Sequence, residues 1–192
     1  MSTLSKVLLL AALALPIPGL AQTPERRLSY TYGDARLVLS DPEGGDRLDG
    51  IRLGGSAQFH PDLFATGALT TLSSDGADFD TLELGLGFRH RISAITDVVG
   101  IAGLVWGDVD PGSDDSGISL TGGVRSRVQP QFEVGPYASY VELFGDGDAS
   151  LIGEGLMHLS PQLALVGSLA LSDDVTTLTF GGRWNFTYRI GS

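Results

Sequence analysis

Hydrophobic and polar residues alternate along much of this chain with a period of two residues. The clearest case is 177–190, where the residues between the apolar positions are polar, charged or glycine. A period of two places successive side chains on opposite faces of an extended strand, which predicts a β-strand with one apolar face. The apolar face of this segment consists of Leu178, Phe180, Gly182, Trp184, Phe186, Tyr188 and Ile190.

The same alternation recurs in 51–59, 82–89 and 118–125, whereas 98–106 and 163–171 are apolar on both faces. The connections between segments are of two kinds that alternate along the chain. Short connections poor in acid lie at 60–62, 92–96, 129–131 and 160–162. Acidic connections lie at 41–49, 75–80, 108–115, 146–148 and 173–174. This alternation predicts ten antiparallel strands joined as hairpins, with eight as the alternative if the less regular segments pair differently.

The sizes of the residues on the two faces separate a membrane barrel from a soluble one. Many residues of the polar face are Gly, Ser or Thr, which fit inside a narrow barrel, while bulky Leu, Phe and Trp occupy the other face. This inverted order predicts an all-β, transmembrane antiparallel up-and-down β-barrel whose short turns face the periplasm and whose acidic loops face outward. A soluble β-sandwich or lipocalin-like barrel is the alternative.

Aromatic residues are predicted to form two belts at the membrane interfaces. The belt near the short turns would contain Tyr30, Tyr32, Phe59, Phe64, Phe88, Phe132, Trp184, Phe186 and Tyr188. The belt near the acidic loops would contain Phe79, Trp106, Tyr140 and Phe144.

The first residues have the features of an export signal. Lys6 precedes the apolar run 7–15, two prolines follow, and small residues lead up to Ala21. We predict a signal peptide at 1–21 and one barrel domain at 22–192, exported through the periplasm to a bacterial outer membrane. The apolar run is too short to cross a bilayer as a helix, which takes about 20 residues.

The composition excludes some classes of function. Acidic residues outnumber basic ones by 23 to 12, for a net charge of −11, so nucleic acid is not an expected partner. Cysteine is absent, which excludes disulfides and thiolate metal sites. No cofactor is expected. Weak metal candidates in one acidic connection are Asp108, Asp110, Asp114 and Asp115, which lack the spacing of a dedicated calcium loop.

Six charged residues fall on the polar face by alternation and are predicted to form a charge network in the lumen. An arginine on the lipid face at the bilayer midplane costs about 2 to 4 kcal/mol, so these charges are expected to meet inside. Counting from the strand ends places Arg52 with Glu83 in the outer half, and Glu154 with Arg183 nearer the middle. The network comprises Arg52, Glu83, Arg89, Arg125, Glu154 and Arg183. Paired charges predict a largely plugged lumen.

Several motifs resemble those of a known group. The stretch 179–186 resembles the C-terminal insertion signal of outer-membrane barrels through Gly181, Trp184 and Phe186. Further similar motifs are Ser29-Tyr30-Thr31-Tyr32, 59–64, and 85–90 followed by Thr96-Asp97. Together they resemble small porin-like outer-membrane barrels of proteobacteria, including a xanthomonad type that activates plant immunity and barrels like outer membrane proteins X and A. The resemblance implies fold and location rather than an activity.

We predict a non-enzymatic barrel with a structural, adhesive or envelope-interaction role. A narrow porin for ions or small solutes is the alternative. A lipid-modifying hydrolase is third, because His158 and Ser160 have the His-x-Ser spacing of a lipid A deacylase of this architecture but fall at a periplasmic turn. Expected partners are outer-membrane lipids, lipopolysaccharide and the barrel-assembly machinery, with divalent cations at the acidic loops. The barrel is expected to be a monomer.

Overall fold

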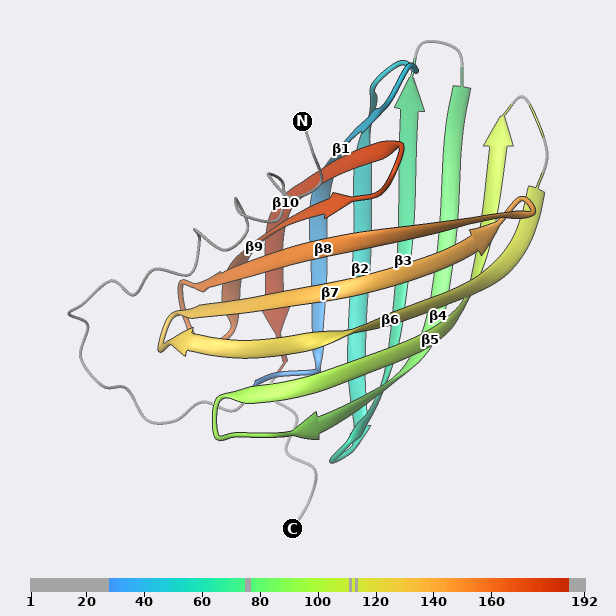
Figure 1. Cartoon of the computed structure of the whole chain (residues 1–192). Helices are drawn as coiled ribbons and strands as arrows, with labels where there is room; N and C mark the ends of the chain where they lie inside the picture. Colours follow the sequence, from blue (N-terminus) through green and yellow to red (C-terminus); the bar gives the residue numbers. More distant parts are fainter. Residues whose placement is uncertain (1–27, 75–76, 111, 113, 187–192) are drawn as a thin grey trace.

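The alternating segments become ten long strands in the computed structural model, which describes residues 28–74, 77–110, 112 and 114–186 (Figure 1). The two segments that are apolar on both faces also form strands. The strands are β1 (Tyr32–Pro42), β2 (Leu48–His60), β3 (Leu63–Ser74), β4 (Ala77–Arg91), β5 (Thr96–Asp110), β6 (Asp114–Gln129), β7 (Phe132–Leu143), β8 (Asp146–His158), β9 (Leu163–Leu171) and β10 (Val175–Asn185).

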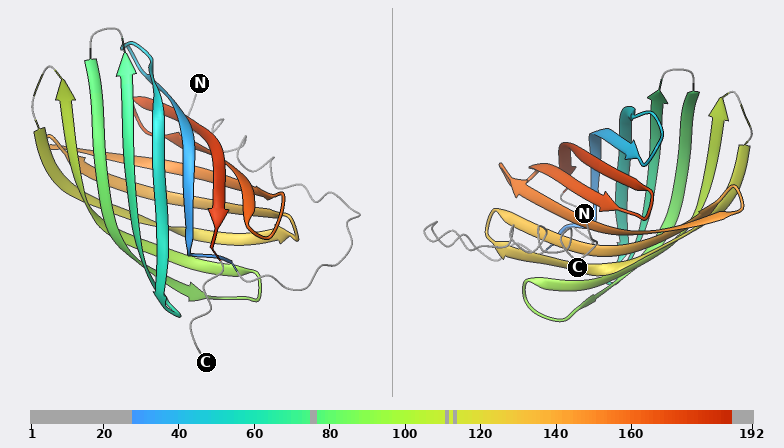
Figure 2. Two further views of the ribbon diagram at one scale, coloured as in Figure 1. Left: turned by 180° about the vertical axis from the view of Figure 1, so that it is seen from behind. Right: turned by 45° about the horizontal axis from the view of Figure 1, so that its top comes forward.

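Each strand pairs antiparallel with its neighbours in the chain, and the first strand pairs with the last. Tyr32 lies opposite Asn185 and Pro42 opposite Val175, so β1 and β10 close the sheet and leave no free edge. The strands surround one interior in each view of Figure 2. The prediction of a ten-stranded up-and-down barrel is confirmed, and the eight-stranded alternative is wrong.

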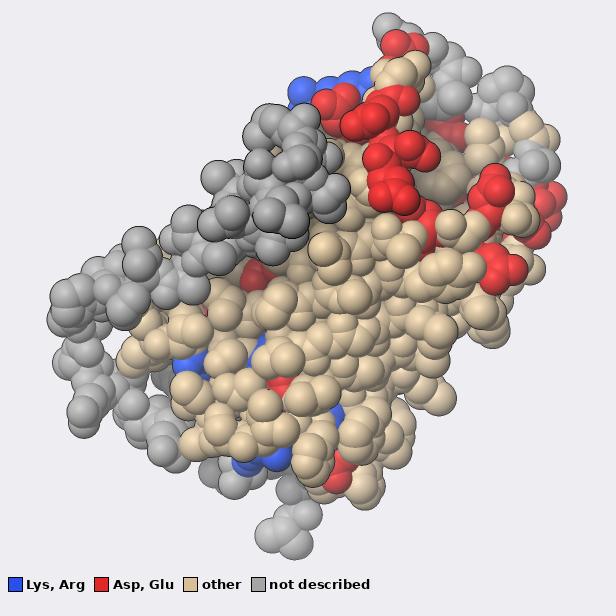
Figure 3. Space-filling model, viewed as in Figure 1, with Lys and Arg blue, Asp and Glu red and all other residues tan. Residues whose placement is uncertain are grey.

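The two ends of the barrel differ in charge. The turn end carries the four connections poor in acid, together with the start of β1 and the end of β10. The loop end carries the other five connections, and Asp and Glu gather there on the face seen in Figure 3. Many of these acidic residues belong to the ends of strands and do not form long loops. Asp78 and Asp80, for example, lie in β4. The β7–β8 connection is a tight turn in which Phe144 and Gly145 both have positive φ, 57° and 77°.

The outer wall is apolar and the interior is largely polar. Along β4, Leu84, Leu86 and Phe88 are 51%, 65% and 50% exposed, while Glu83 and Arg89 face inward. The segments that are apolar on both faces supply aliphatic side chains to the interior as well. Val99 and Val105 of β5 and Val166 of β9 are buried there, which explains why these two strands lack a polar face.

Part of the predicted aromatic belts is wrong. Phe59, Phe88, Trp184 and Phe186 at the turn end do point outward, as do Trp106 and Tyr140 at the loop end. Phe144 instead packs over Gly107, with its ring 6.3 Å from that of Phe79. Tyr30 and Phe64, however, are only 3% exposed and lie inside the barrel. The ring of Phe64 occupies the space over Gly87, where an added Cβ would lie 2.1 Å from the ring. Tyr32 also turns inward, with its ring against Arg183.

Some predictions fall outside the described residues. The signal peptide lies within residues 1–27, and Tyr188 and Ile190 lie within 187–192, so both stay predictions. Among the described residues, no helix is long and apolar enough to cross a membrane.

Candidate functional site

The lumen contains charged side chains at three depths, and the first pair lies nearest the loop end. Arg52 of β2 and Glu83 of β4 approach to 3.7 Å, with side chains 35% and 30% exposed. Arg52 also donates to Thr70 at 3.2 Å, and Ser119 donates to the second oxygen of Glu83 at 2.6 Å. The pair is accessible to water, so each charge is partly solvated.

A four-membered ring of charges occupies the middle of the lumen. Arg36 donates to Asp34 at 2.8 Å and to Glu154 at 2.9 Å. Arg183 closes the ring with contacts of 3.1 Å to Asp34 and 3.4 Å to Glu154, and its guanidinium lies 3.9 Å from the centre of the Tyr32 ring. Two arginines and two carboxylates balance one another in charge. This balance permits ions to be buried that would otherwise carry a large desolvation cost.

A second cluster surrounds Glu133 near the turn end. Its side chain is fully buried and accepts from Arg125 at 2.6 Å and from His158 at 2.8 Å. Arg127 donates to the same carboxylate. Three cationic or potentially cationic groups from β6 and β8 therefore converge on a single carboxylate from β7.

Residues Leu28–Tyr30, just before β1, lie inside the lumen at the turn end, where Leu28 and Tyr30 are buried. We call them the plug. The guanidinium groups of Arg89 and Arg125 lie 5.0 and 5.1 Å from the centre of the Tyr30 ring, and the centre of the Phe64 ring lies 5.0 Å from it. Its hydroxyl donates to Asp97 at 3.1 Å, and burial raises the pKa of this hydroxyl above its ordinary value, so it stays a donor at neutral pH.

The backbone of the plug is held as well. Arg125 donates to the carbonyl of Ser29 at 2.7 Å, and Ser56 donates to that of Tyr30 at 2.8 Å. Asp97, which receives the Tyr30 hydroxyl, also contacts Arg89 at 2.9 Å and Arg91 at 3.6 Å. The plug is thus attached to the lumen wall by polar and cation–π contacts, and Leu28 and Tyr30 also pack against Phe64 and Val99.

A cavity of about 380 Å³ lies on the loop-end side of the plug. Tyr30, Phe64 and Arg125 line it, as do Arg52 and Glu83. The exposed fraction of the arginine side chains falls with distance from the loop end, from 35% for Arg52 to 9% for Arg36 and 2% for Arg183. The lumen is therefore a vestibule that water reaches from the loop end and that ends at the plug.

The structure brings together two of the expected pairs, Arg52 with Glu83 and Glu154 with Arg183. Arg89 and Arg125 pair instead with residues that sequence reasoning missed, Asp97 and Glu133. Other residues missed were Asp34, Arg36, Arg127 and Tyr30. A signal for Asp34 and Arg36 was present, since they alternate with Ala35 and Leu37 in the segment that forms β1.

The residues of the insertion motif lie on the closing strand. Trp184 and Phe186 point outward and are about half exposed. Gly181 faces β1 so closely that an added Cβ would lie 2.0 Å from the carbonyl oxygen of Ala35. A glycine is therefore required at this position where the barrel closes. Its role as an assembly signal stays a prediction.

The weak metal candidates lie at the ends of strands. Asp108, near the end of β5, lies opposite Asp114 of β6, and Asp115 lies opposite Gly107. Asp110 is the last residue of β5, and its side chain lies outside the described part. Within the described residues, no three side chains of metal-ligating type are grouped to hold an ion.

His158 and Ser160 are engaged in separate contacts. The His158 ring contacts Glu133, whereas the Ser160 hydroxyl accepts the backbone N–H groups of Gln162 and Leu163 at 3.2 and 3.0 Å. The serine thus stabilises the β8–β9 turn, and the histidine belongs to the Glu133 cluster.

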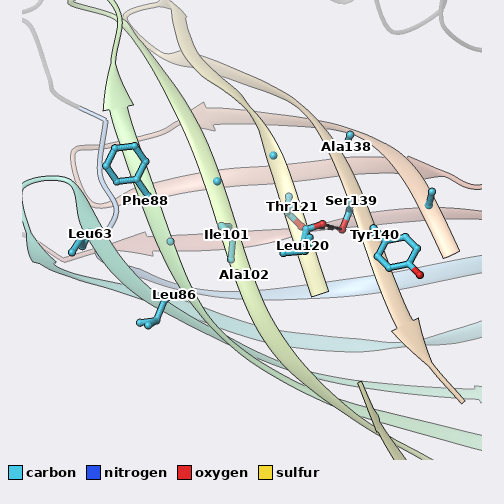
Figure 4. Close-up of a pocket in the computed structure, with 14 residues that line it drawn as sticks. Leu63, Leu86, Phe88, Ile101, Ala102, Leu120, Thr121, Ala138, Ser139 and Tyr140 are labelled. Atoms are coloured by element: carbon cyan, nitrogen blue, oxygen red, sulfur yellow. Dashed lines mark hydrogen bonds between the residues drawn. The ribbon is translucent and has the colours of Figure 1, made fainter. Parts of the chain in front are cut away.

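The outer wall has an apolar hollow that extends from Leu63 of β3 to Ala149 of β8 (Figure 4). Its volume is about 810 Å³. Bulky side chains surround small ones such as Gly122 and Ala138. The polar pair beside it, Thr121 and Ser139, is joined by a hydrogen bond of 2.9 Å. The hollow offers no charged group for chemistry.

No protein-family model and no curated protein matches the sequence. Solved structures with a similar fold include an outer membrane channel from Pseudomonas putida F1, with 11% identity and a TM-score of 0.49 over 88% of this chain and 100% of that one. A KdgM porin has 13% identity and a TM-score of 0.46 over 83% and 100% of the two chains. The attachment invasion locus protein Ail of Yersinia pestis has 16% identity and a TM-score of 0.37 over 82% and 97%. These likenesses concern the fold alone, and the resemblance to the xanthomonad type stays a prediction.

Proposed function

We propose that this barrel spans a bacterial outer membrane with its loop end outward and serves a structural, adhesive or envelope-interaction role. The observation that carries the proposal is the inverted distribution of side chains, with a leucine-rich outer wall around buried ion pairs. Exposing such a wall to water is unfavourable by about 25 cal/mol for each Å² of apolar surface, and hydrocarbon removes that cost. A closed sheet leaves no strand edge for lipid to contact, as a bilayer requires.

A closed lumen favours a scaffold over an open pore. The plug closes the turn end, and the middle ring of charges joins β1, β8 and β10 through side chains that extend into the interior. Each group in the ring has a partner of opposite charge, so the interior is held together by contacts that a water-filled channel would lack.

A narrow porin is the second candidate. The vestibule of about 380 Å³ supports it, because water reaches Arg52 and Glu83 from the loop end. Lipid hydrolysis stays third, since Ser160 and His158 serve different contacts at the turn end. We propose that the chain is not an enzyme.

The surfaces of the barrel suggest its partners. The apolar wall suits lipid, and the acidic loop end suits divalent cations that also bind the phosphates of lipopolysaccharide. The insertion motif on β10 suits the barrel-assembly machinery. We propose that the protein works as a monomer.

Location and orientation are tested together by single cysteines, for which the chain offers a clean background because it has none of its own. Asp46→Cys and Asp173→Cys lie exposed at the loop end and are expected to react with a membrane-impermeant maleimide on whole cells. The reason is that the reagent reaches only the outer face of an intact outer membrane.

The matched controls are Gln131→Cys and Gln162→Cys, which are equally exposed but lie at the turn end. They are expected to stay unlabelled until the outer membrane is permeabilised. If only the turn-end pair were labelled on intact cells, the orientation would be the opposite of the one proposed. If the cysteines at both ends reacted with the maleimide on intact cells, the membrane location would be refuted.

A further inference from the structure

We propose that the plug, Leu28–Tyr30, is removable and that the lumen conducts small anions once the plug has left. The inference rests on the proposed function in one respect, since it takes the barrel to span a membrane. It goes further by assigning a gated conducting state to a barrel that is otherwise closed.

The barrier between the two ends of the lumen is about one side chain thick. The ring of Tyr30 lines the vestibule, which water reaches from the loop end. The hydroxyl of the same residue donates to Asp97, whose other oxygen contacts Arg91. Arg91 is 40% exposed at the turn end. Tyr30 therefore reaches from the vestibule to side chains that border solvent on the far side.

The plug can leave without disturbing the sheet. Strand β1 begins at Tyr32, so all the strand pairs that close the barrel lie beyond the plug. Thr31 anchors the chain at that point, because its carbonyl accepts the N–H of Phe186 at 2.9 Å and its hydroxyl accepts that of Gln58 at 3.1 Å. Hydrogen bonds hold the backbone of the plug, and water can replace them. Leu28 and Tyr30 also pack against Phe64 and Val99, and these few apolar contacts are lost when the plug leaves.

The wall around the plug determines which ions would pass. Among the described residues at this depth, three arginines share two carboxylates, and His158 adds a group that is cationic when protonated. The arginines are Arg89, Arg91 and Arg125, and the carboxylates are Asp97 and Glu133. The charges deeper in the vestibule balance, so the excess at the plug sets an anion preference.

The test is planar-bilayer recording of the full refolded protein and of a variant that lacks both buried plug side chains, Leu28→Ala with Tyr30→Ala. We expect steady conductance from the double variant at least tenfold above that of the wild type. Under a gradient of KCl, the sign of the reversal potential is expected to show chloride passing more readily than potassium. At about 1 M salt the Debye length is near 3 Å, so the acidic loop end is screened and the narrow region dominates.

Two further variants keep the test specific. Leu69→Ala with Tyr140→Ala removes the same two residue types from the outer wall and is expected to stay closed. Arg89→Gln added to the plug variant is expected to lower its chloride preference. Heat-dependent gel mobility confirms that each variant is folded.

Each outcome is informative. A folded plug variant that is as silent as the wild type overturns the inference and leaves the proposed function intact. A plug variant that prefers potassium overturns the anion selectivity. High steady conductance in the wild type would instead overturn the closed lumen on which the proposed function depends.

Discussion

Glu133→Gln is expected to lower the free energy of unfolding by about 3 to 5 kcal/mol, because it removes the negative charge of the buried carboxylate on which Arg125, Arg127 and His158 converge. Arg125 and His158 contact that carboxylate at 2.6 and 2.8 Å, and Arg127 contacts it as well. Urea unfolding of the barrel in lipid vesicles measures the change directly. The temperature at which the folded form is lost on gels should fall in parallel.

The matched control is Glu43→Gln, an exposed glutamate in the β1–β2 connection. Its effect on stability is expected to lie within about 0.5 kcal/mol of zero. Equal stability of the Glu133 and Glu43 variants would mean that the arginines are hydrated and that the turn end of the lumen is open to water.

Glu154→Gln and Arg183→Gln are expected to be less damaging together than the sum of their separate effects. Glu154→Gln leaves Asp34 facing both Arg36 and Arg183, so the ring gains a positive charge. Removing Arg183 in the same chain restores neutrality and keeps the Arg36–Asp34 pair. The expected coupling between the two sites is about 0.5 to 3 kcal/mol, measured by a double-mutant cycle on the free energy of unfolding.

The exposed pair Arg47–Asp49 provides a control cycle. Its atoms approach to 3.0 Å, but the side chains are 56% and 66% exposed. The coupling expected there is at most about 1 kcal/mol, since water screens the pair. Strictly additive losses at Glu154 and Arg183 would show that the middle ring is solvated and holds no buried pairs.

The barrel itself could be predicted from the sequence because its strands repeat a local signal. In β10, each inward residue from Thr177 to Arg183 follows an outward one, and one extended strand is enough to produce this pattern. The number of strands followed from the alternation of acidic and acid-poor connections. Neither step depended on which strand lies next to which.

Charge pairs could be predicted only where depth alone decides them. Arg52 and Glu83 lie on strands that both flank β3, so counting from the strand ends brought them together. The contact between Arg36 and Glu154 joins residues 118 apart in sequence and depends on how the barrel closes and how its strands tilt. The partners of Glu133 were still harder to predict. The register between β6 and β7 shifts between Ser126 and Gln129, so counting residues from the strand ends does not place Glu133 opposite the right residues of β6.

The plug has no sequence signal of this kind. Leu28 and Tyr30 precede the first strand, and the aromatic character of Tyr30 led to the prediction that it belongs to an interfacial belt. What places Tyr30 inside is a socket formed by Arg89, Arg125 and Phe64, which come from three other strands. A socket assembled from distant strands exists only after the barrel has closed.

The central claim is that the resting protein is a membrane-spanning barrel with a closed lumen, and single-channel recording of the refolded wild type tests it most directly. The plug predicts insertion into the bilayer with little or no steady conductance, because Tyr30 closes the path at the turn end. Large and steady conductance from the wild-type protein would contradict the account, since it would require an open aqueous pore where the structure places buried ion pairs.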